Sequence, residues 1–148
     1  MKLVYWSYSS RASIEALNKH NNTPLHYAAW NGQTSTVELL IKNGASIEVR
    51  DKDNNTPLHL AASNGHTSTV LLLLTKGASI ESMGKDNRTP LHVAAWDGHT
   101  GTVVLLLKEG TSIEDRDSGN NTPLHLAAMR GHTNAVKLLK TEAAKLVH

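Results

Sequence analysis

The sequence predicts an all-α solenoid, in which pairs of short antiparallel helices joined by β-hairpin-like loops are stacked one behind another. Two observations predict this fold. The letters TPLH recur with one fixed period, which is typical of repeat architectures, and they begin at Thr23, Thr56, Thr89 and Thr122. Each unit also holds two short segments with helical apolar spacing, each closed by a glycine in most copies. In such a stack each unit contacts only its neighbours.

The second unit shows how the first helix of a repeat is built. Thr56 is expected to be its N-cap, and Pro57 to take the first helical position, where a missing N–H costs nothing. One apolar face is formed by Leu58, Leu60, Ala61 and Ala62, and its small alanines let a neighbouring helix approach closely. Gly65 is expected to end the helix in a left-handed cap.

The second helix of this unit is expected to open at His66 and Thr67 and to end before Gly77. Val70 and residues 72–74 supply its apolar stripe. The polar segment that follows predicts a hairpin-like connection to the next pair. Two residues before each capping threonine stands an asparagine, which can adopt a positive φ: Asn21, Asn54, Asn87 and Asn120.

These letters resemble the ankyrin repeat, whose 33-residue signature includes TPLH-x-AA, G-H, V-x-LLL and GA. The resemblance covers residues 18–148 and implies repeats at 18–50, 51–83, 84–116 and 117–148, preceded by an N-terminal half-repeat cap at 1–17. The chain departs from the family pattern where asparagine replaces the glycine before x-Thr. Hydroxylation of hairpin asparagines, known in the family, is not expected, because glutamates occupy that position: Glu48, Glu81 and Glu114.

The two ends of the array are expected to be capped. Residues 1–17 align with the second half of a repeat, with polar substitutions that suit a helix facing water. Lys140 stands where earlier repeats are apolar, and Ala143 replaces the helix-ending glycine, so the last helix is expected to run on toward Leu146. Four repeats and a half unit fit a complete array; a fragment of a longer solenoid is the open alternative.

Composition favours an intracellular protein of the cytoplasm or nucleus. The chain has no cysteine, which suits a reducing compartment. The apolar stretch in its first residues is too short for a signal peptide or a membrane span. Four Asn-x-Thr tripeptides fit the glycosylation pattern, but each is explained by a turn asparagine before a capping threonine. A net charge of +2 gives no global reason to expect nucleic-acid or membrane binding.

The recurring histidines and glutamates are interpreted as structural, so no metal, cofactor or catalytic activity is expected. Neighbouring helices pack about 8 to 10 Å apart, too far for one histidine per repeat to share an ion. The TPLH histidines are instead expected to hydrogen-bond near their own helix starts. The one-per-repeat glutamates are expected to form a solvated charge row: Glu15, Glu48, Glu81 and Glu114.

The resemblance implies that a partner binds the concave surface made by the hairpin tips and the first helices. Positions there differ most between copies, whereas packing dictates the interior. Trp30 and Trp96 share one repeat position, and Ser63 at the equivalent position shows that the core does not require tryptophan there. The predicted partner-binding residues are Lys19, His20, Tyr27, Trp30, Arg50, Lys52, Met83, Arg88, Trp96, Asp97, Arg116, Met129 and Arg130.

The sequence therefore favours a non-catalytic protein-interaction module, a scaffold or adaptor, with a monomer favoured. Seven basic residues against three acidic ones on the predicted face suit an acidic or mixed apolar-acidic protein or peptide. Alternatives are an inhibitory or regulatory subunit of an enzyme, an engineered scaffold without a natural partner, or, with less support, a nucleic-acid binder. Both tryptophans could also simply stiffen the stack.

A second candidate surface lies on the convex side. Leu71 and Val104 occupy a second-helix position that holds Glu38 and Lys137 in the outer repeats. Their neighbours leave this side poor in charge: Thr67, Ser68, Thr69, Thr100 and Thr102. The patch predicts self-association or a second partner, unless these are ordinary scattered apolar residues.

Overall fold

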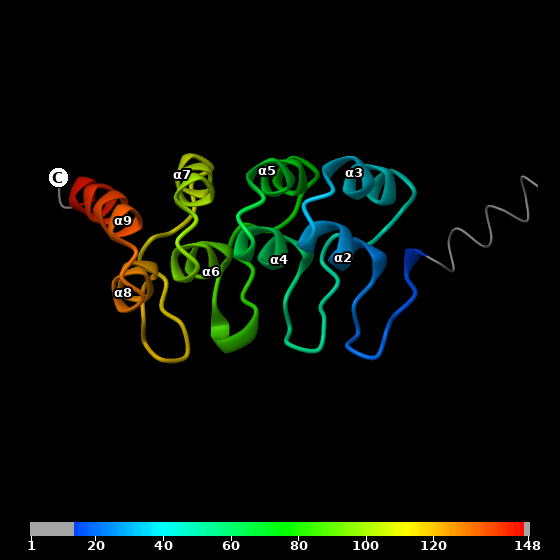
Figure 1. Ribbon diagram of the computed structural model, residues 1–148, viewed down its shortest axis with the longest axis horizontal. Coiled ribbons are helices and arrows are strands. Elements are labelled where there is room, and N and C mark those ends of the chain that lie inside the picture. The colour runs from blue at the N-terminus through cyan, green and yellow to red at the C-terminus, as the bar shows by residue number, and fades with distance from the viewer. Residues whose placement is uncertain (1–13, 147–148) are drawn as a thin grey trace, which may run out of the picture.

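The computed structural model describes residues 14–146, which form two layers of short helices above a row of long loops (Figure 1). The first helices of the four repeats are α2 (Pro24–Trp30), α4 (Pro57–Ser63), α6 (Pro90–Trp96) and α8 (Pro123–Met129). The second helices are α3 (Thr34–Lys42), α5 (Thr67–Thr75), α7 (Thr100–Lys108) and α9 (Thr133–Lys145). A short 3-10 turn, η1 (Lys85–Asn87), lies in the loop before α6. The described loops contain no β-strand.

Each helix packs against its partner within the repeat and against the matching helix of the next repeat. First helices contact first helices and second helices contact second helices along the whole series, as Figure 1 shows. The predicted all-α stack of helix pairs is therefore confirmed.

The first helices begin with identical caps. At α4 the Thr56 hydroxyl accepts a hydrogen bond from the His59 N–H, and the Thr56 N–H donates to His59 Nδ1 at 3.2 Å. Pro57 is the first helical residue, and the same arrangement opens α2, α6 and α8. A helix of only seven residues is marginal alone, so this reciprocal cap contributes directly to its formation. The predicted N-caps are confirmed.

Gly65 shows why glycine must follow a first helix. Its φ is +71°, in the left-handed region, and a Cβ added there would lie 2.6 Å from Nδ1 of His99 in the next repeat. Both the backbone conformation and the close approach of that ring exclude a side chain. The asparagines predicted to tolerate a positive φ do so, at 61°, 66°, 56° and 65° for Asn21, Asn54, Asn87 and Asn120.

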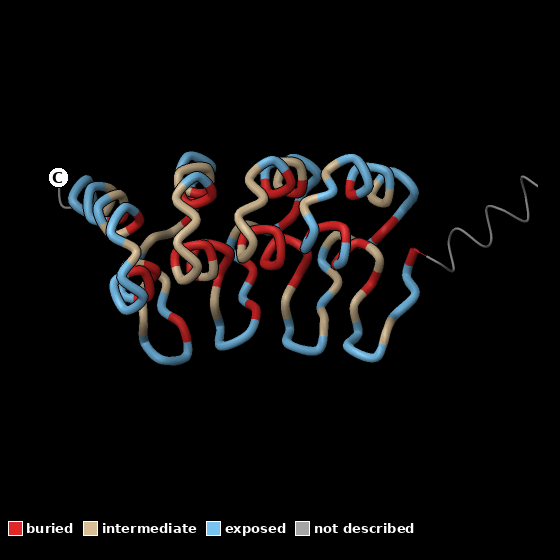
Figure 2. Tube along the Cα trace, viewed as in Figure 1, coloured by how far each residue is buried: buried red, intermediate tan, exposed pale blue. Residues whose placement is uncertain are grey.

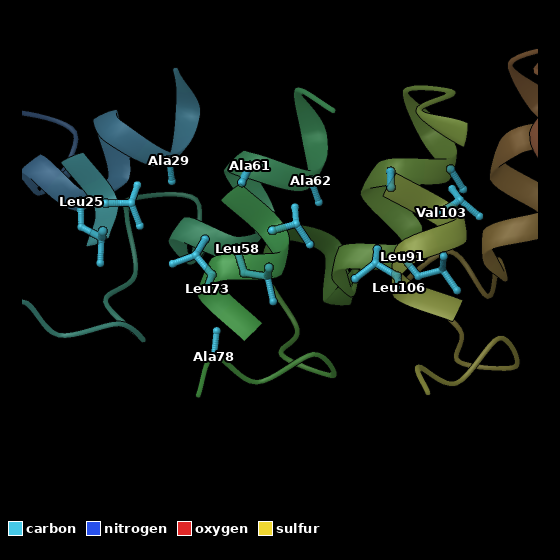
Figure 3. Close-up of a cluster of buried hydrophobic side chains, with 14 of the residues drawn as sticks. Leu25, Ala29, Leu58, Ala61, Ala62, Leu73, Ala78, Leu91, Val103 and Leu106 are labelled. Atoms are coloured by element: carbon cyan, nitrogen blue, oxygen red, sulfur yellow. The ribbon is translucent and has the colours of Figure 1, made fainter. Parts of the chain in front are cut away.

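The core runs as one continuous band between the two helix layers (Figure 2). Ala61 and Ala62 are fully buried on α4, where their small size suits close contact with the neighbouring first helices. Leu73 from α5 and Leu106 from α7 enter the same band from the second layer (Figure 3). Within residues 14–146 every buried polar side-chain atom has a hydrogen-bond partner.

The two ends differ in how much of each prediction the structure tests. Helix α9 has 13 residues where α5 has nine, and it continues through Ala143, so the predicted extension toward Leu146 is confirmed. The predicted N-terminal half-repeat cap lies mostly outside the described residues. Of it, Ile14 is buried in the core cluster, in line with the proposed alignment to later repeats.

Candidate interaction surface

Two hollows lie in succession along the surface formed by the long loops and the first helices, which we call the groove face. The first hollow, about 260 Å³, lies between repeats one and two and includes Tyr27, Trp30, Asp51 and Asp53 in its lining. The second, about 230 Å³, lies between repeats two and three, and its lining includes Ser63, Lys85, Arg88, Trp96 and Asp97. Neighbouring repeats therefore leave side-chain-sized recesses where their loops meet the first helices.

The structure brings together five of the predicted partner-binding residues in these hollows. Tyr27 and Trp30, each 49% exposed, line the first hollow, and Arg88, Trp96 and Asp97 line the second. The other predicted residues line neither hollow but are exposed: Lys19, His20, Arg50, Lys52, Met83, Arg116, Met129 and Arg130.

Trp96 is less accessible than Trp30, with which it shares its repeat position. Its indole is half-buried, and the guanidinium carbons of Arg88 and Arg130 lie 4.8 and 4.6 Å from the ring centre. Both are cation–π contacts. The chain therefore supplies its own cations to this tryptophan.

Arg88 also forms an ion pair that sequence reasoning missed. Its Nε donates to Asp117 Oδ2 at 3.2 Å, and the Asp117 side chain is only 1% exposed. Burial alone would raise the pKa of this carboxyl, but hydrogen bonds from the N–H groups of Asn121 and Gly119 and from Arg88 outweigh burial and lower the pKa. The sequence signal that could have indicated this ion pair was one arginine and one aspartate in neighbouring loops.

Arg50 and Arg116 also use their guanidiniums within the chain. Arg50 donates to the carbonyls of Asn54 and Met83 and to the Ser82 hydroxyl, at 2.7 to 2.8 Å, and so connects two loops. Arg116 donates to the Asn120 carbonyl at 3.0 Å. The basic excess expected on this face is consequently smaller than a count of letters suggests, because Arg88 is paired and Arg50 is committed to the loops.

The TPLH histidines connect consecutive repeats. Because the capping threonine N–H donates to Nδ1, that nitrogen is unprotonated, and Nε2 carries the proton. Nε2 of His59 then donates to the Arg88 carbonyl at 2.9 Å, and His26 and His92 donate likewise to the next loop. Burial lowers the pKa of His26 and His92, and that of His59 to about 4. The predicted hydrogen bonds at the helix starts are confirmed; the inter-repeat bonds were not foreseen.

The second histidine series binds the preceding repeat. His66, His99 and His132 use Nε2 to contact the carbonyls of Trp30, Ser63 and Trp96 at 2.8 to 2.9 Å. In the part of the chain that the structure describes, no three histidine or acidic side chains lie close enough together to hold a metal ion. These rings hold the stack together.

The glutamate row is exposed, as predicted, and three of its four side chains also make hydrogen bonds that were not foreseen from the sequence. Oε1 of Glu15, Glu48 and Glu81 accepts the N–H of the serine 31 residues later, at 2.8 to 3.2 Å. Each carboxylate therefore joins one repeat to the next. The first of these bonds places Glu15 in the same role as its counterparts in the later repeats.

On the opposite surface, Leu71 is exposed and Val104 is half-buried, on the adjacent helices α5 and α7. Two threonines expected to face solvent beside them do not. Thr69 and Thr102 are buried, and their hydroxyls bond to those of Thr34 and Thr67 on the second helix of the preceding repeat, at 2.8 and 3.0 Å. The charge-poor patch is accordingly smaller than predicted.

None of the helices within residues 14–146 combines the length and apolar character needed to cross a membrane.

Comparisons with protein-family models and with curated proteins both identify ankyrin repeats. The family model described as "Ankyrin repeats (3 copies)" matches three overlapping stretches, at residues 2–83, 34–117 and 79–147. Over 34 residues the chain is 56% identical to "Ankyrin repeat and IBR domain-containing protein 1" of Mus musculus and of Homo sapiens. That match covers 23% of this chain, which spans only 3% of the length of each relative.

Proposed function

Because the chain belongs to the ankyrin-repeat family, whose repeats are generally protein–protein interaction modules, we propose that it is a non-catalytic module that binds a protein or peptide on its groove face. The observation that supports this is the pair of successive hollows. Trp30 of α2 lines the first and Trp96 of α6 lines the second, and the two tryptophans occupy the same position in their repeats.

The exposed apolar side chains fit such a role. Tyr27, Trp30, Met83 and Met129 are all large and exposed, and all belong to the loops or first helices. Aromatic residues and methionine are enriched at protein interfaces, and tryptophan and tyrosine dominate binding energy where they are anchors. Neighbouring helices lie about 10 Å apart, which equals about three residues of an extended chain. An extended segment could therefore place every third side chain at a repeat junction.

The charges on the groove face favour a partner of mixed charge. Lys85 lines the second hollow, and Lys52, Arg116 and Arg130 are exposed on other loops of the groove face, so all four suit acidic side chains of a partner. Asp51 and Asp53 line the first hollow itself and suit the opposite charge. The sequence led us to expect an acidic or mixed apolar-acidic partner. These aspartates add the expectation that the partner also carries a basic residue.

Capture of partners from cell extract by wild type and by Trp30→Ser tests the proposal. Serine is a conservative choice because Ser63 occupies that position in repeat two without disturbing the first helix. Loss of a binding anchor costs at least about 2 kcal/mol, so we expect about thirtyfold weaker capture. Trp96 is a poorer probe, because its ring also supports Arg88 and Arg130.

The matched control is Leu71→Glu, which also removes one large exposed apolar side chain but from α5. Glu38 occupies the same position in repeat one, so this change suits the fold as well. The proposal fails if Trp30→Ser remains folded, as judged by thermal melting, and captures the same proteins in the same amounts as wild type.

A further inference from the structure

The surroundings of the two tryptophans differ in a specific way. Trp96 lies under Arg88 and Arg130, and Arg88 is paired with the buried carboxylate of Asp117. Ring, guanidinium and carboxylate thus form a compact three-part contact between repeats three and four. Every member of this contact comes from the chain itself.

Around Trp30 the ring and the carboxylate recur, but the guanidiniums do not. The residues 66 positions before Arg88, Arg130 and Asp117 are Asn22, Asn64 and Asp51. The Asn64 amide donates to the carbonyls of Trp30 and Leu60, so it is directed to the backbone rather than to the ring. In residues 14–146 the guanidiniums found over tryptophan rings are the two over Trp96.

Asp51 is held in the same way as Asp117. Its Oδ1 accepts the N–H groups of Asp53 and Asn55 at 2.9 Å, as Oδ1 of Asp117 accepts those of Gly119 and Asn121. Oδ2, the oxygen that meets Arg88 in Asp117, has no ion-pair partner in Asp51 among the described residues. Asp51 and Trp30 both line the first hollow, which also contains Tyr27 and Asp53.

We propose that the first hollow binds an arginine side chain of the protein partner, whose guanidinium stacks on Trp30 and pairs with Asp51. It takes the place over Trp30 that Arg88 takes over Trp96. A planar guanidinium can stack on an indole and donate to a carboxylate at its edge, which a lysine ammonium does less well. Asp53 adds a second carboxylate, an exposed one, to the lining. This inference rests on the proposed function and names one residue of the partner segment.

The test uses Nα-acetyl-arginine amide as the probe and the citrulline analogue, which has nearly the same shape and no charge, as its control. We expect the arginine probe, and not the citrulline probe, to shift the NMR resonances of the Trp30 indole and of the backbone at residues 51–55 in a saturable way. The indole of Trp96, already covered by two arginines, should respond less.

Two variants make the test specific without endangering the fold. Asp51→Asn keeps the turn, because Asn18 at the same position of the preceding repeat accepts the N–H groups of His20 and Asn22 through Oδ1. It should weaken arginine binding by about tenfold or more, the effect of one charge-assisted hydrogen bond. Asn22→Arg supplies from within the chain the guanidinium that repeat three has, and it should abolish the response.

The inference is overturned if both probes shift Trp30 equally, if the arginine probe shifts nothing, or if Asn22→Arg and Asp51→Asn respond as wild type does. Partner capture separates this from the proposed function. If Trp30→Ser loses partners that Asn22→Arg and Asp51→Asn retain, the groove face binds but not through an arginine. If none of these variants changes capture, the proposed function itself fails.

Discussion

The Trp30 and Trp96 junctions have the same backbone frame and different surfaces. Both tryptophans end a capped first helix, and both carbonyls accept a hydrogen bond from a histidine 36 residues later. Arg88 and Arg130 cover the second ring, whereas asparagines stand at the corresponding positions around the first. Two substitutions in a repeated frame therefore decide whether the chain's own guanidiniums cover the tryptophan ring.

The histidine frame that recurs from junction to junction, through His26, His59 and His92, is expected to lose stability in acid. His59 has its pKa lowered to about 4 by burial, while the unfolded chain titrates near 6.5. The unfolded state thus binds the proton first, so the stability is fully present above pH 6.5 and is lost as pH falls toward 4. His59 alone accounts for about 3 kcal/mol over that window, and His26 and His92 act in the same direction.

Urea denaturation followed by circular dichroism between pH 7 and pH 4 measures this loss. His59→Gln, whose side chain cannot titrate in this range, should reduce the loss of unfolding free energy between pH 7 and pH 4 by the contribution of His59. A stability that stays level through the window would contradict a frame built on neutral histidines.

The Trp96 junction is expected to lose stability when Arg88, which the Trp30 junction lacks, is removed. Asparagine occupies the Arg88 position in the other three repeats, as Asn22, Asn55 and Asn121, so Arg88→Asn suits the backbone. It leaves Asp117 without its cation, although two N–H donors remain. We expect a loss of about 2 kcal/mol in the free energy of unfolding, below the range for a fully stranded charge.

The double variant Arg88→Asn, Asp117→Asn should recover part of that loss, since the asparagine can still accept the two N–H bonds. Thermal and urea unfolding of both variants provide the measurement. A loss below about 0.5 kcal/mol for Arg88→Asn would mean that the pair behaves as an ordinary surface ion pair.

The elements of this fold were predictable because their causes lie within one repeat. The Thr-Pro-Leu-His cap, the left-handed glycine and the positive-φ asparagine each depend on a few neighbouring residues, and the structure confirms all three. The long α9 was predictable for the same reason, because Ala143 removes the local stop signal. The fixed period of the sequence then repeats each local solution in every unit.

The candidate site was harder to predict because its contacts join different repeats. Arg88 meets Asp117 in the loop of the next repeat, and Arg130 reaches back to a ring in the preceding one. A long arginine side chain can reach several hydrogen-bonding or aromatic groups in the neighbouring repeats. Which of them it contacts depends on how the repeats pack, and the sequence of one repeat does not contain that information. Comparing matching positions in different repeats, rather than reading one repeat alone, could have found the Arg88 and Asp117 pair.

The smallest expected effect is the difference in stability between Trp96→Ser and Trp30→Ser. Trp96 is half-buried and carries two cation–π contacts, worth about 0.5 to 1 kcal/mol each, so its loss should cost about 1 kcal/mol or more. Trp30 is 49% exposed and has no arginine over it in the described chain, so its loss should stay within about 0.5 kcal/mol. Serine fits both sites, as Ser63 shows, so the backbone cost is common to the two variants. Equal losses in thermal melting would mean that Trp30 also supports the stack, and its exposure would then not mark a surface kept for a partner.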